Sequence, residues 1–322
     1  MKYVYVYACH EDEQALCQLE LRSLLGAGVV IGARHAVSAR CVEPSRSPFL
    51  KLRLDVWLEA GSVEELASRV GELTVRGSTF KVVFAETDTA VSYDRQRDVE
   101  RELGRHVRGK AQMRQPDQWF AVTELGGRWL FGDCSYGEAV WLQHQQKPQN
   151  YSTALGTRLA RAVVNIAVPE IAGRRVIDPC CGIGTVLIEA ISMGIDIVGN
   201  DMNPLAVRGA RVNLDHFGMP NVVSHGDMRT LGAASEQGPE SLASPEGGYD
   251  ALILDMPYNL CSKLPEDEQL LMLQSARRLT KHRAVIITTE QIDPLIKQAG
   301  FRIAERCMVR KGNFRRQILV CE

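Results

Sequence analysis

The second half of the chain alternates short apolar segments with amphipathic ones, and this pattern constrains the fold more than any other feature. From residue 163 onward it predicts strands at 175–178, 195–200 and 249–254, and helices at 185–193 and 204–217. Strands that alternate with helices in this way are typical of a parallel sheet with helices on both faces. Ligands of such sheets bind beside the carboxyl ends of the strands, so the residues after each strand are candidates for a functional site.

A glycine-containing turn joins the first of these strands to the first helix. Asp178 ends the strand, and Thr185 begins the helix. Gly182 and Gly184 lie between them, where backbone without a side chain could approach a ligand. The second strand leads into Asp201, about 17 residues after Gly184 and so near the spacing at which an acidic residue binds ribose hydroxyls. We therefore expect a nucleoside cofactor here, with a simple tight turn as the alternative.

Two further positions bear on the identity of the cofactor. A dinucleotide would need a third glycine to seat its pyrophosphate, and Leu187 occupies the expected place. S-adenosylmethionine has no phosphate and is favoured on this ground. Asp227 follows the third strand, where its carboxylate could accept a hydrogen bond from the adenine amino group. An acidic residue in that position is also common as a helix cap, which is the alternative interpretation.

The strand at 249–254 runs directly into the tetrapeptide Asp255-Met256-Pro257-Tyr258. Methylation of an exocyclic amino group needs an acceptor for its N–H, a rigid backbone that orients the nitrogen, and a face on which the base can stack. Asp255 could be the acceptor, the Met256-Pro257 backbone could orient the nitrogen, and Tyr258 could stack on the base. The alternative for Tyr258 is a tyrosine of the core.

The first half of the chain has the pattern of a smaller α+β unit. A polar stretch without apolar periodicity, residues 143–150, predicts the boundary between two domains, at 1–145 and 146–322. The predicted elements before it are strands at 3–9, 50–58 and 80–84, helices at 12–25, 63–70 and 94–107, and a hairpin of 119–125 with 129–132 that turns at Gly126-Gly127.

Composition and charge narrow the class of protein. Of 322 residues 45% are hydrophobic, yet no apolar run approaches the roughly 18 residues of a membrane span. The formal net charge is −1, so a nucleic-acid site would have to be a local basic patch. Nine scattered cysteines and the absence of an export signal at the N-terminus favour a reducing cytoplasm. Basic residues cluster at Arg95, Arg97, Arg101, Arg105, Arg108, Lys110 and Arg114, and at Arg306, Arg310, Lys311, Arg315 and Arg316.

Taken together, these motifs resemble the amino methyltransferases. The tetrapeptide at 255–258 is similar to their signature of Asp or Asn, Pro, Pro, and Tyr or Phe, with Met256 in place of the first Pro. Residues 151–165 are similar to the segment before the catalytic domain in tRNA guanosine-10 N2-methyltransferases. Residues 109–117 resemble part of the THUMP domain, which in that family adjoins a ferredoxin-like unit and binds tRNA. An arginine-rich approach to the catalytic domain in that family is replaced here by Gln145-Gln146-Lys147-Pro148.

The resemblance implies a Rossmann-like class I methyltransferase domain with a mostly parallel seven-stranded sheet, preceded by a THUMP-like and ferredoxin-like α+β domain. It implies S-adenosylmethionine-dependent methylation of a guanosine N2 in tRNA or another structured RNA, without a metal and without a membrane. The catalytic residues would be Asp255, Pro257 and Tyr258. The cofactor-binding residues would be Asp178, Cys180, Gly182, Gly184, Thr185, Asp201, Met202, Asp227 and Met228.

Two other functions are compatible with these motifs. Enzymes that methylate adenine N6 or cytosine N4 in DNA or RNA use related tetrapeptides. A catalytically inactive RNA-binding protein on the same fold is the third hypothesis, because Met256 departs from the signature. The terminal segment 310–316 predicts the turn of a hairpin whose last strand is 317–321, with arginines that contact phosphates or only keep the turn soluble.

Overall fold

The structure is a computed structural model that describes residues 1–151, 154–231, 248–257, 264–311 and 314–322. The chain forms two compact units, Met1–Cys9 with Leu25–Ala139, and His10–Leu24 with Val140–Glu322. The expected division at residue 145 differs from this, because residues 10–24 and 140–145 pack with the second unit. Residues 232–248 are rich in Gly, Ser, Ala, Pro and Glu, a composition that predicts a loop, and except for Gly248 they fall outside the described residues.

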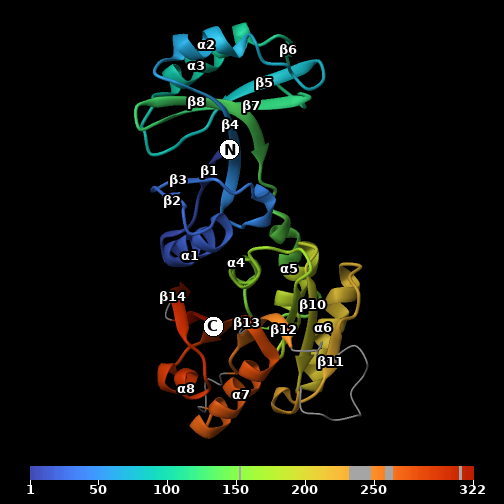
Figure 1. Cartoon of the computed structure of the whole chain (residues 1–322). Coiled ribbons are helices and arrows are strands. Elements are labelled where there is room, and N and C mark those ends of the chain that lie inside the picture. Colours follow the sequence, from blue (N-terminus) through green and yellow to red (C-terminus); the bar gives the residue numbers. More distant parts are fainter. Residues whose placement is uncertain (152–153, 232–247, 258–263, 312–313) are drawn as a thin grey trace. The chain divides into compact units, whose positions relative to one another are not determined.

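The first unit contains an eight-stranded sheet (Figure 1). The predicted hairpin is confirmed, because β7 and β8 pair antiparallel up to Leu125 and Arg128. Strands β2, β3 and β6 were not predicted, since each has four residues or fewer and little room for a pattern. The strand order is β2 (Val30–Ile31), β3 (His35–Ser38), β1 (Lys2–Tyr7), β4 (Leu50–Ala60), β8 (Arg128–Tyr136), β7 (Gln118–Leu125), β5 (Thr79–Phe84) and β6 (Lys110–Ala111).

Two helices cover one face of this sheet. Helix α2 (Val63–Val70) begins at Ser62 and α3 (Tyr93–His106) at Ser92, and each serine accepts a hydrogen bond from a backbone N–H of the first turn. Their apolar sides pack on aromatic side chains of the sheet, among them Phe80, Phe120 and Phe131. A short 3₁₀ helix, Pro44–Arg46, precedes β4.

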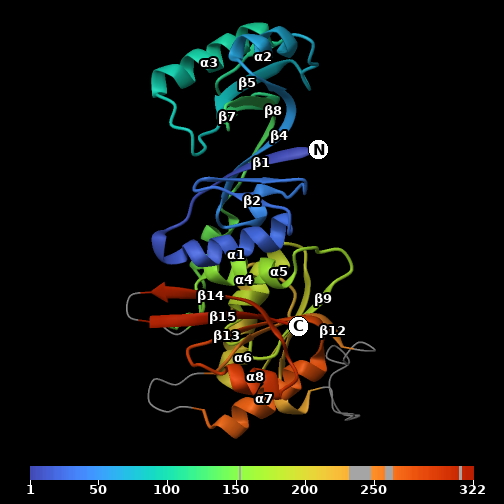
Figure 2. The same ribbon diagram turned by 60° about the vertical axis from the view of Figure 1, so that its left-hand side comes forward.

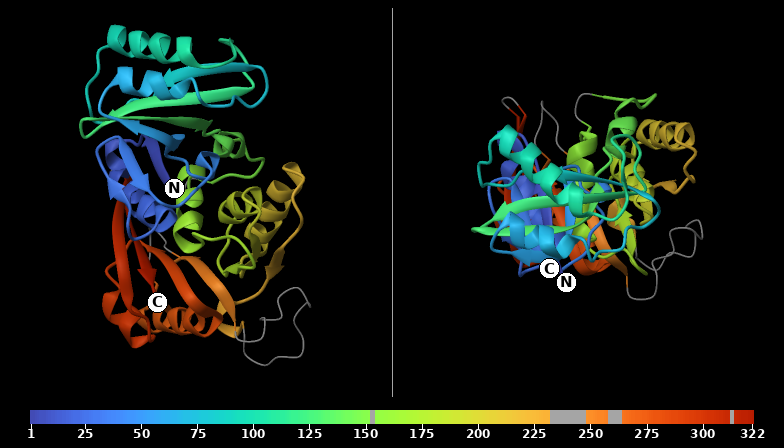
Figure 3. Two further views of the ribbon diagram at one scale, coloured as in Figure 1. Left: turned by 45° about the horizontal axis from the view of Figure 1, so that its top comes forward. Right: turned by 90° about the horizontal axis from the view of Figure 1, so that it is seen from above.

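The second unit contains the mostly parallel seven-stranded sheet that the family resemblance implies. The strand order is β11 (Val223–His225), β10 (Asp196–Asp201), β9 (Arg175–Asp178), β12 (Tyr249–Asp255), β13 (Thr280–Thr288), β15 (Phe314–Cys321) and β14 (Ile303–Lys311). The first five strands are parallel, and the terminal pair, red in Figure 3, is antiparallel. From β9 the chain moves outward through β10 to β11 and returns to the other side of β9 as β12. The strand order therefore reverses between β9 and β12, which is where ligands bind in such sheets.

Helices cover both faces of this second sheet (Figure 2). Helices α4 (Thr157–Ala167) and α5 (Thr185–Ser192) contact each other on one face, and α7 (Glu266–Leu279) and α8 (Asp293–Gln298) contact each other on the opposite face. Helix α6 (Pro204–His216) packs on β10 and β11. Fully buried apolar side chains such as Leu252, Leu273 and Ile286 fill the layer beneath α7.

Helix α1 (Gln14–Leu25) belongs almost entirely to the second unit, although it follows β1 in sequence. The Asn165 side chain of α4 donates a hydrogen bond to the buried Glu20 carboxylate at 2.6 Å. Arg22 forms an ion pair with Glu305 at 2.9 Å. These contacts explain why a helix from the first part of the sequence packs with the second sheet. Three 3₁₀ helices, Glu11–Glu13, Val140–Gln145 and Met228–Thr230, complete the described elements of this unit.

The terminal hairpin corrects one prediction. Strand β15 begins at Phe314, so Arg315 and Arg316 lie in a strand and not in the turn, paired with Arg310 and Val309. Arg316 is buried, with 7% of its surface exposed, so it is not part of a solvated turn. The hairpin itself is confirmed. Among the described residues, no helix has both the length and the apolar character that crossing a membrane would require.

Candidate functional site

A cavity of about 370 Å³ opens at the carboxyl ends of β9 to β12, where the strand order reverses. Its wall is strongly acidic. Four aspartates follow or end the four strands, and α7 adds a glutamate, whereas a single arginine is the only basic residue of the described lining. These residues are Asp178, Asp201, Asp227, Asp255, Glu268 and Arg229.

The turn between β9 and α5 forms one side of this cavity. Gly182 and Gly184 have φ angles of +53° and +81°, a region that favours glycine. A Cβ at Gly182 would also lie 2.6 Å from the Tyr151 hydroxyl, so a side chain there would displace that tyrosine. Gly184 precedes α5 without a side chain that caps the helix. Gly182 lines the cavity, so a ligand can approach the backbone of the turn closely at that residue.

Asp201 holds the turn from the neighbouring strand. Its Oδ2 accepts a hydrogen bond from the Gly182 N–H and its Oδ1 one from the Asn203 N–H, both at 2.8 Å. A carboxylate can accept about four hydrogen bonds, so roughly two positions remain for a ligand. Asp201 can thus fix the glycine turn and accept two hydroxyl protons at once.

Two buried asparagines clamp the loops of the site, and the sequence analysis missed both. Asn200 donates from Nδ2 to the Pro179 and Gly226 carbonyls, which joins the loops after β9 and β11 to β10. Asn213 of α6 donates to the Gln149 and Ile183 carbonyls at 3.0 Å. It also accepts from the Gln149 N–H at 2.9 Å. The sequence contained one signal for them: each is a polar residue at a strand or helix position where the periodicity predicts an apolar, core-facing side chain.

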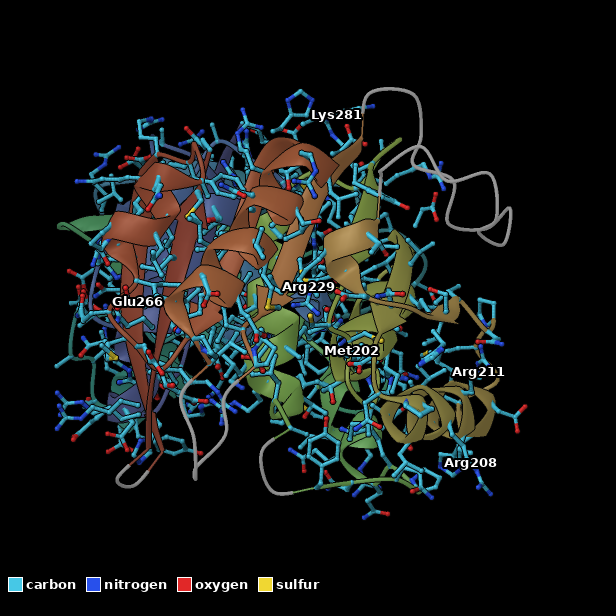
Figure 4. All side chains as sticks on the ribbon, turned by 90° about the horizontal axis from the view of Figure 1, so that it is seen from below. Met202, Arg208, Arg211, Arg229, Glu266 and Lys281 are labelled. Carbon is cyan, nitrogen blue, oxygen red and sulfur yellow. The ribbon has the colours of Figure 1, made fainter. Side chains whose placement is uncertain are left out.

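Replacing Asn213 with alanine is expected to lower the free energy of unfolding by about 1–3 kcal/mol, because the buried Ile183 carbonyl and the part-buried carbonyl and N–H of Gln149 lose their partner. Chemical denaturation of the two proteins measures this difference. Arg208, exposed on the same helix (Figure 4), is the matched control, and its alanine variant should change stability by less than about 0.5 kcal/mol. Equal effects of the two substitutions would contradict the clamp.

Two carboxyl groups on the floor of the cavity are held in an unfavourable environment. Burial raises the pKa of Asp178 well above its usual range, and the nearby carboxylates of Asp255 and Asp201 raise it further. Burial also raises the pKa of Asp255 to about 7, against the opposing effect of Arg316. Such shifts are reversed when a cation binds beside the carboxylates. This part of the cavity therefore favours a positively charged ligand.

Two polar atoms in the cavity lining have no hydrogen-bond partner among the described residues. One is Oδ1 of Asp255, and the other is Oγ1 of Thr185, and both atoms are buried. Leaving such atoms without a partner costs about 1–3 kcal/mol each, so they indicate where a ligand would donate or accept hydrogen bonds. Asp255 lies at the end of β12 and Thr185 at the start of α5.

The structure brings most of the residues predicted from the sequence into this one cavity. Gly184 is in the turn but not in the lining, and Tyr258 lies outside the described residues. The prediction omitted the lining residues Tyr151, Leu155, Arg229, Glu268 and Met272, which no single strand end identifies. The predicted residues that line the cavity are Asp178, Cys180, Gly182, Thr185, Asp201, Met202, Asp227, Met228, Asp255 and Pro257.

Part of the chain is similar in sequence to known guanine-N2 methyltransferases. It is 31% identical over 167 residues to the tRNA (guanine(10)-N2)-dimethyltransferase of Pyrococcus abyssi, a match that covers 50% of this chain and 47% of that protein. It is 28% identical over 142 residues to the mouse U6 snRNA (guanine-N(2))-methyltransferase THUMPD2, covering 43% and 25% of the two chains. The chain thus spans less than half the length of these relatives.

Two further comparisons concern the solved structures and the protein families. The crystal structure of TrmN from Thermus thermophilus aligns over 100% of this chain and 99% of that one, at 17% identity and a TM-score of 0.47. The family model described as "RMKL-like, methyltransferase domain" matches residues 144–315, more than half of the chain, and includes strands β9 to β14, the glycine turn and the acidic cavity described above. The chain therefore belongs to the family of RMKL-like methyltransferase domains.

Proposed function

We propose that this protein transfers a methyl group from S-adenosylmethionine to the exocyclic N2 of a guanosine in tRNA. The observation that carries the proposal is the position of Asp255, whose buried Oδ1 has no described partner at the carboxyl end of β12 in an acidic cavity. Family membership and the guanine-N2 methyltransferases among the relatives support the same reaction.

The cavity suits S-adenosylmethionine in its charge and in its hydrogen-bond acceptors. Five carboxyl groups face one guanidinium, which is itself paired with Asp227, so the wall suits a sulfonium and an ammonium group better than a phosphate. Asp201 has acceptor positions left for two ribose hydroxyls. The glycine turn allows close approach by its backbone. When bound, the cofactor supplies a methyl group activated by the positive sulfur.

Asp255 would accept a hydrogen bond from the amino group of the base and so orient the nitrogen toward the methyl group. Orientation of this kind can contribute several kcal/mol to catalysis. The Met256 N–H donates to the Ile287 carbonyl at 2.9 Å, which fixes the backbone that follows. The Met256 side chain is buried in the core beneath α7. Met256 also lines the cavity between Asp255 and Pro257, so the departure from the Pro-Pro signature changes the apolar wall of the site and leaves both neighbours in the lining.

The proposed cationic cofactor gives the site a defined pH dependence. Asp255, with a pKa of about 7, is largely protonated at pH 6, and a nearby sulfonium favours its ionised form. Affinity for S-adenosylmethionine should therefore rise from about pH 6 to pH 8, by at most about tenfold per unit below the pKa. Affinity for S-adenosylhomocysteine, whose sulfur is uncharged, should change much less. Calorimetric titration of both ligands measures the slopes, and equal slopes would count against the proposal.

The first unit supplies basic residues that support an RNA substrate. Much of the charge of α3 is neutralised within the helix, by ion pairs of Arg97 with Glu100 and Arg105 with Glu102. Arg108, Lys110 and Arg114 follow the helix, are exposed, and have no ion pair among the described residues. We therefore assign the tRNA contact to the segment around these three residues, in a unit of THUMP-like and ferredoxin-like type. The eight described cysteines are free, in keeping with a cytoplasmic protein.

The test of this function is a methylation assay with purified protein, S-adenosylmethionine and unmodified tRNA transcripts. The RNA is digested and the nucleosides are identified by mass spectrometry. N2-methylguanosine, or its N2-dimethyl form, is the expected product. Methylated adenosine or cytidine would instead show that the target nucleoside is not guanosine. Binding of tRNA without binding of S-adenosylmethionine would favour an inactive RNA-binding protein.

A further inference from the structure

A second, narrow cavity adjoins the acidic one at the end of β13. Met256 and Pro257 line both cavities, so the two meet at the segment that follows β12. The volume of the second cavity, about 10 Å³, has room for the polar edge of a ligand but not for a whole base. Its lining comes from this segment, from the end of β13 and from one side chain of α7. The lining residues are Met256, Pro257, Gln269, Thr288, Thr289 and Glu290.

The sheet places Glu290 on the same edge as Asp255. Strand β13 runs parallel to β12, with Asp255 opposite Ile287, and Glu290 follows three residues after Ile287. The Met256 N–H donates to the Ile287 carbonyl at 2.9 Å, which fixes the two strand ends against each other. Neighbouring strands lie about 5 Å apart, a separation that one base can span. A base whose amino group reaches Asp255 can therefore present an adjacent polar group to Glu290.

The backbone of Glu290 is fixed, whereas its carboxylate is largely unused. The Glu290 N–H donates to Thr288 Oγ1, and Gln317 Nε2 donates to the Glu290 carbonyl, both at 3.0 Å. The half-buried carboxylate receives one long hydrogen bond, from Gln269 Nε2 at 3.4 Å, and forms no ion pair with the part of the chain that the structure describes. Gln269 donates more closely to the Leu264 carbonyl, at 2.8 Å. About three of the four acceptor positions of the carboxylate are therefore open to a ligand.

An open carboxylate at this position distinguishes guanine from the other bases that carry an amino group. The proposed function places the N2 amino group of the base against Asp255, and the next atom along the edge of guanine is N1, which carries a hydrogen. Adenine and cytosine have a lone pair on the ring nitrogen beside their amino group. A carboxylate accepts a hydrogen bond from the first kind of edge and is repelled by the second.

We propose that Glu290 is a specificity-determining residue, whose carboxylate accepts a hydrogen bond from N1–H of the target guanine while Asp255 accepts one from N2–H. Glu290 takes no proton and only reads the edge of the base. The proposal deepens the proposed function and rests on it, because it assumes that a guanine is methylated in this site. It also explains why adenine and cytosine would be rejected by the same catalytic tetrapeptide.

The test uses tRNA in which 2-aminopurine riboside replaces the guanosine that the protein methylates. This analogue keeps the 2-amino group but has a lone pair at N1, and it lacks O6. In single-turnover assays the wild type should methylate guanosine faster than 2-aminopurine by about 100-fold or more. Glu290→Gln, whose amide can donate to the lone pair, should slow guanosine methylation by about 10- to 100-fold and reduce the preference to less than about tenfold. A role confined to packing would slow both substrates equally.

Two further variants complete the test. Glu266→Gln makes the same chemical change on the exposed first turn of α7 (Figure 4), outside both cavities, and should leave the rate and the preference unchanged. Glu290→Asp keeps a carboxylate and should retain most of the preference for guanosine.

The outcomes separate this inference from the proposed function. Calorimetric titration should show that Glu290→Gln binds S-adenosylmethionine within about threefold of the wild type. An unchanged preference in this variant, or loss of its cofactor binding, overturns the inference alone. If the wild type forms no N2-methylguanosine in tRNA, the proposed function fails, and this inference fails with it.

Discussion

Replacing Asp255 with alanine is expected to lower the rate of methyl transfer by about 10³-fold or more, while affinity for S-adenosylmethionine changes by less than about tenfold. The reason is that the buried Oδ1 of Asp255 is a carboxylate acceptor in the cavity that has no partner among the described residues. Without this acceptor the amino group of the base is no longer oriented toward the methyl group, so the rate falls. The residues around the glycine turn are unchanged, so the cofactor still binds. Single-turnover methylation of tRNA and calorimetric titration of the cofactor measure the two quantities.

Two further variants sharpen this experiment. Asp255→Asn keeps one carbonyl oxygen, so it should retain more activity than the alanine variant and lose the dependence of cofactor affinity on pH near 7. Asp250 lies at the opposite end of the same strand, where it pairs with Arg174 at 3.3 Å. Asp250→Asn should therefore leave the rate within about twofold of the wild type. An active Asp255→Ala protein would remove Asp255 from the catalytic residues.

Replacing Asp201 with alanine is expected to weaken binding of S-adenosylmethionine by about 100-fold or more. The variant loses the acceptors proposed for two ribose hydroxyls, and it also leaves the Gly182 and Asn203 N–H groups without their partner. Hydrogen bonds to a charged group contribute about 1.5–3 kcal/mol each, so two of them account for an effect of this size. Calorimetric titration measures the affinity directly, without dependence on RNA.

Asp196 at the start of the same strand is the matched control for Asp201. It is exposed and forms an ion pair with Arg175 at 3.4 Å, at the edge of the sheet away from the cavity. Its alanine variant should bind the cofactor as the wild type does. If Asp201→Ala bound S-adenosylmethionine within about threefold of the wild type, the assignment of the ribose to this residue would be wrong.

Much of the cavity could be predicted because its parts are encoded by adjacent residues. Strand β9 and the turn to α5 are formed by consecutive residues, from Arg175 to Thr185. An apolar strand pattern followed by glycines is therefore visible in the local sequence. The same holds for Asp201 after β10 and Asp255 at the end of β12. An acidic residue at the end of a parallel strand lies on the ligand side of the sheet in any such fold. Short strands such as β2 and β6 carry no such periodicity and were missed.

The amino-acid sequence by itself determined the α/β class, the glycine turn and the acidic residues at four strand ends, because each depends on neighbours within a few residues. Only the tertiary structure decided that β12 returns beside β9 and so gathers those four ends around one cavity. It also decided the pKa of Asp255, the clamps of Asn200 and Asn213, and the burial of Arg316. Burial and hydrogen-bond partners are set by residues far apart in the chain, whose approach depends on the order of strands in the sheet and leaves no local pattern in the sequence.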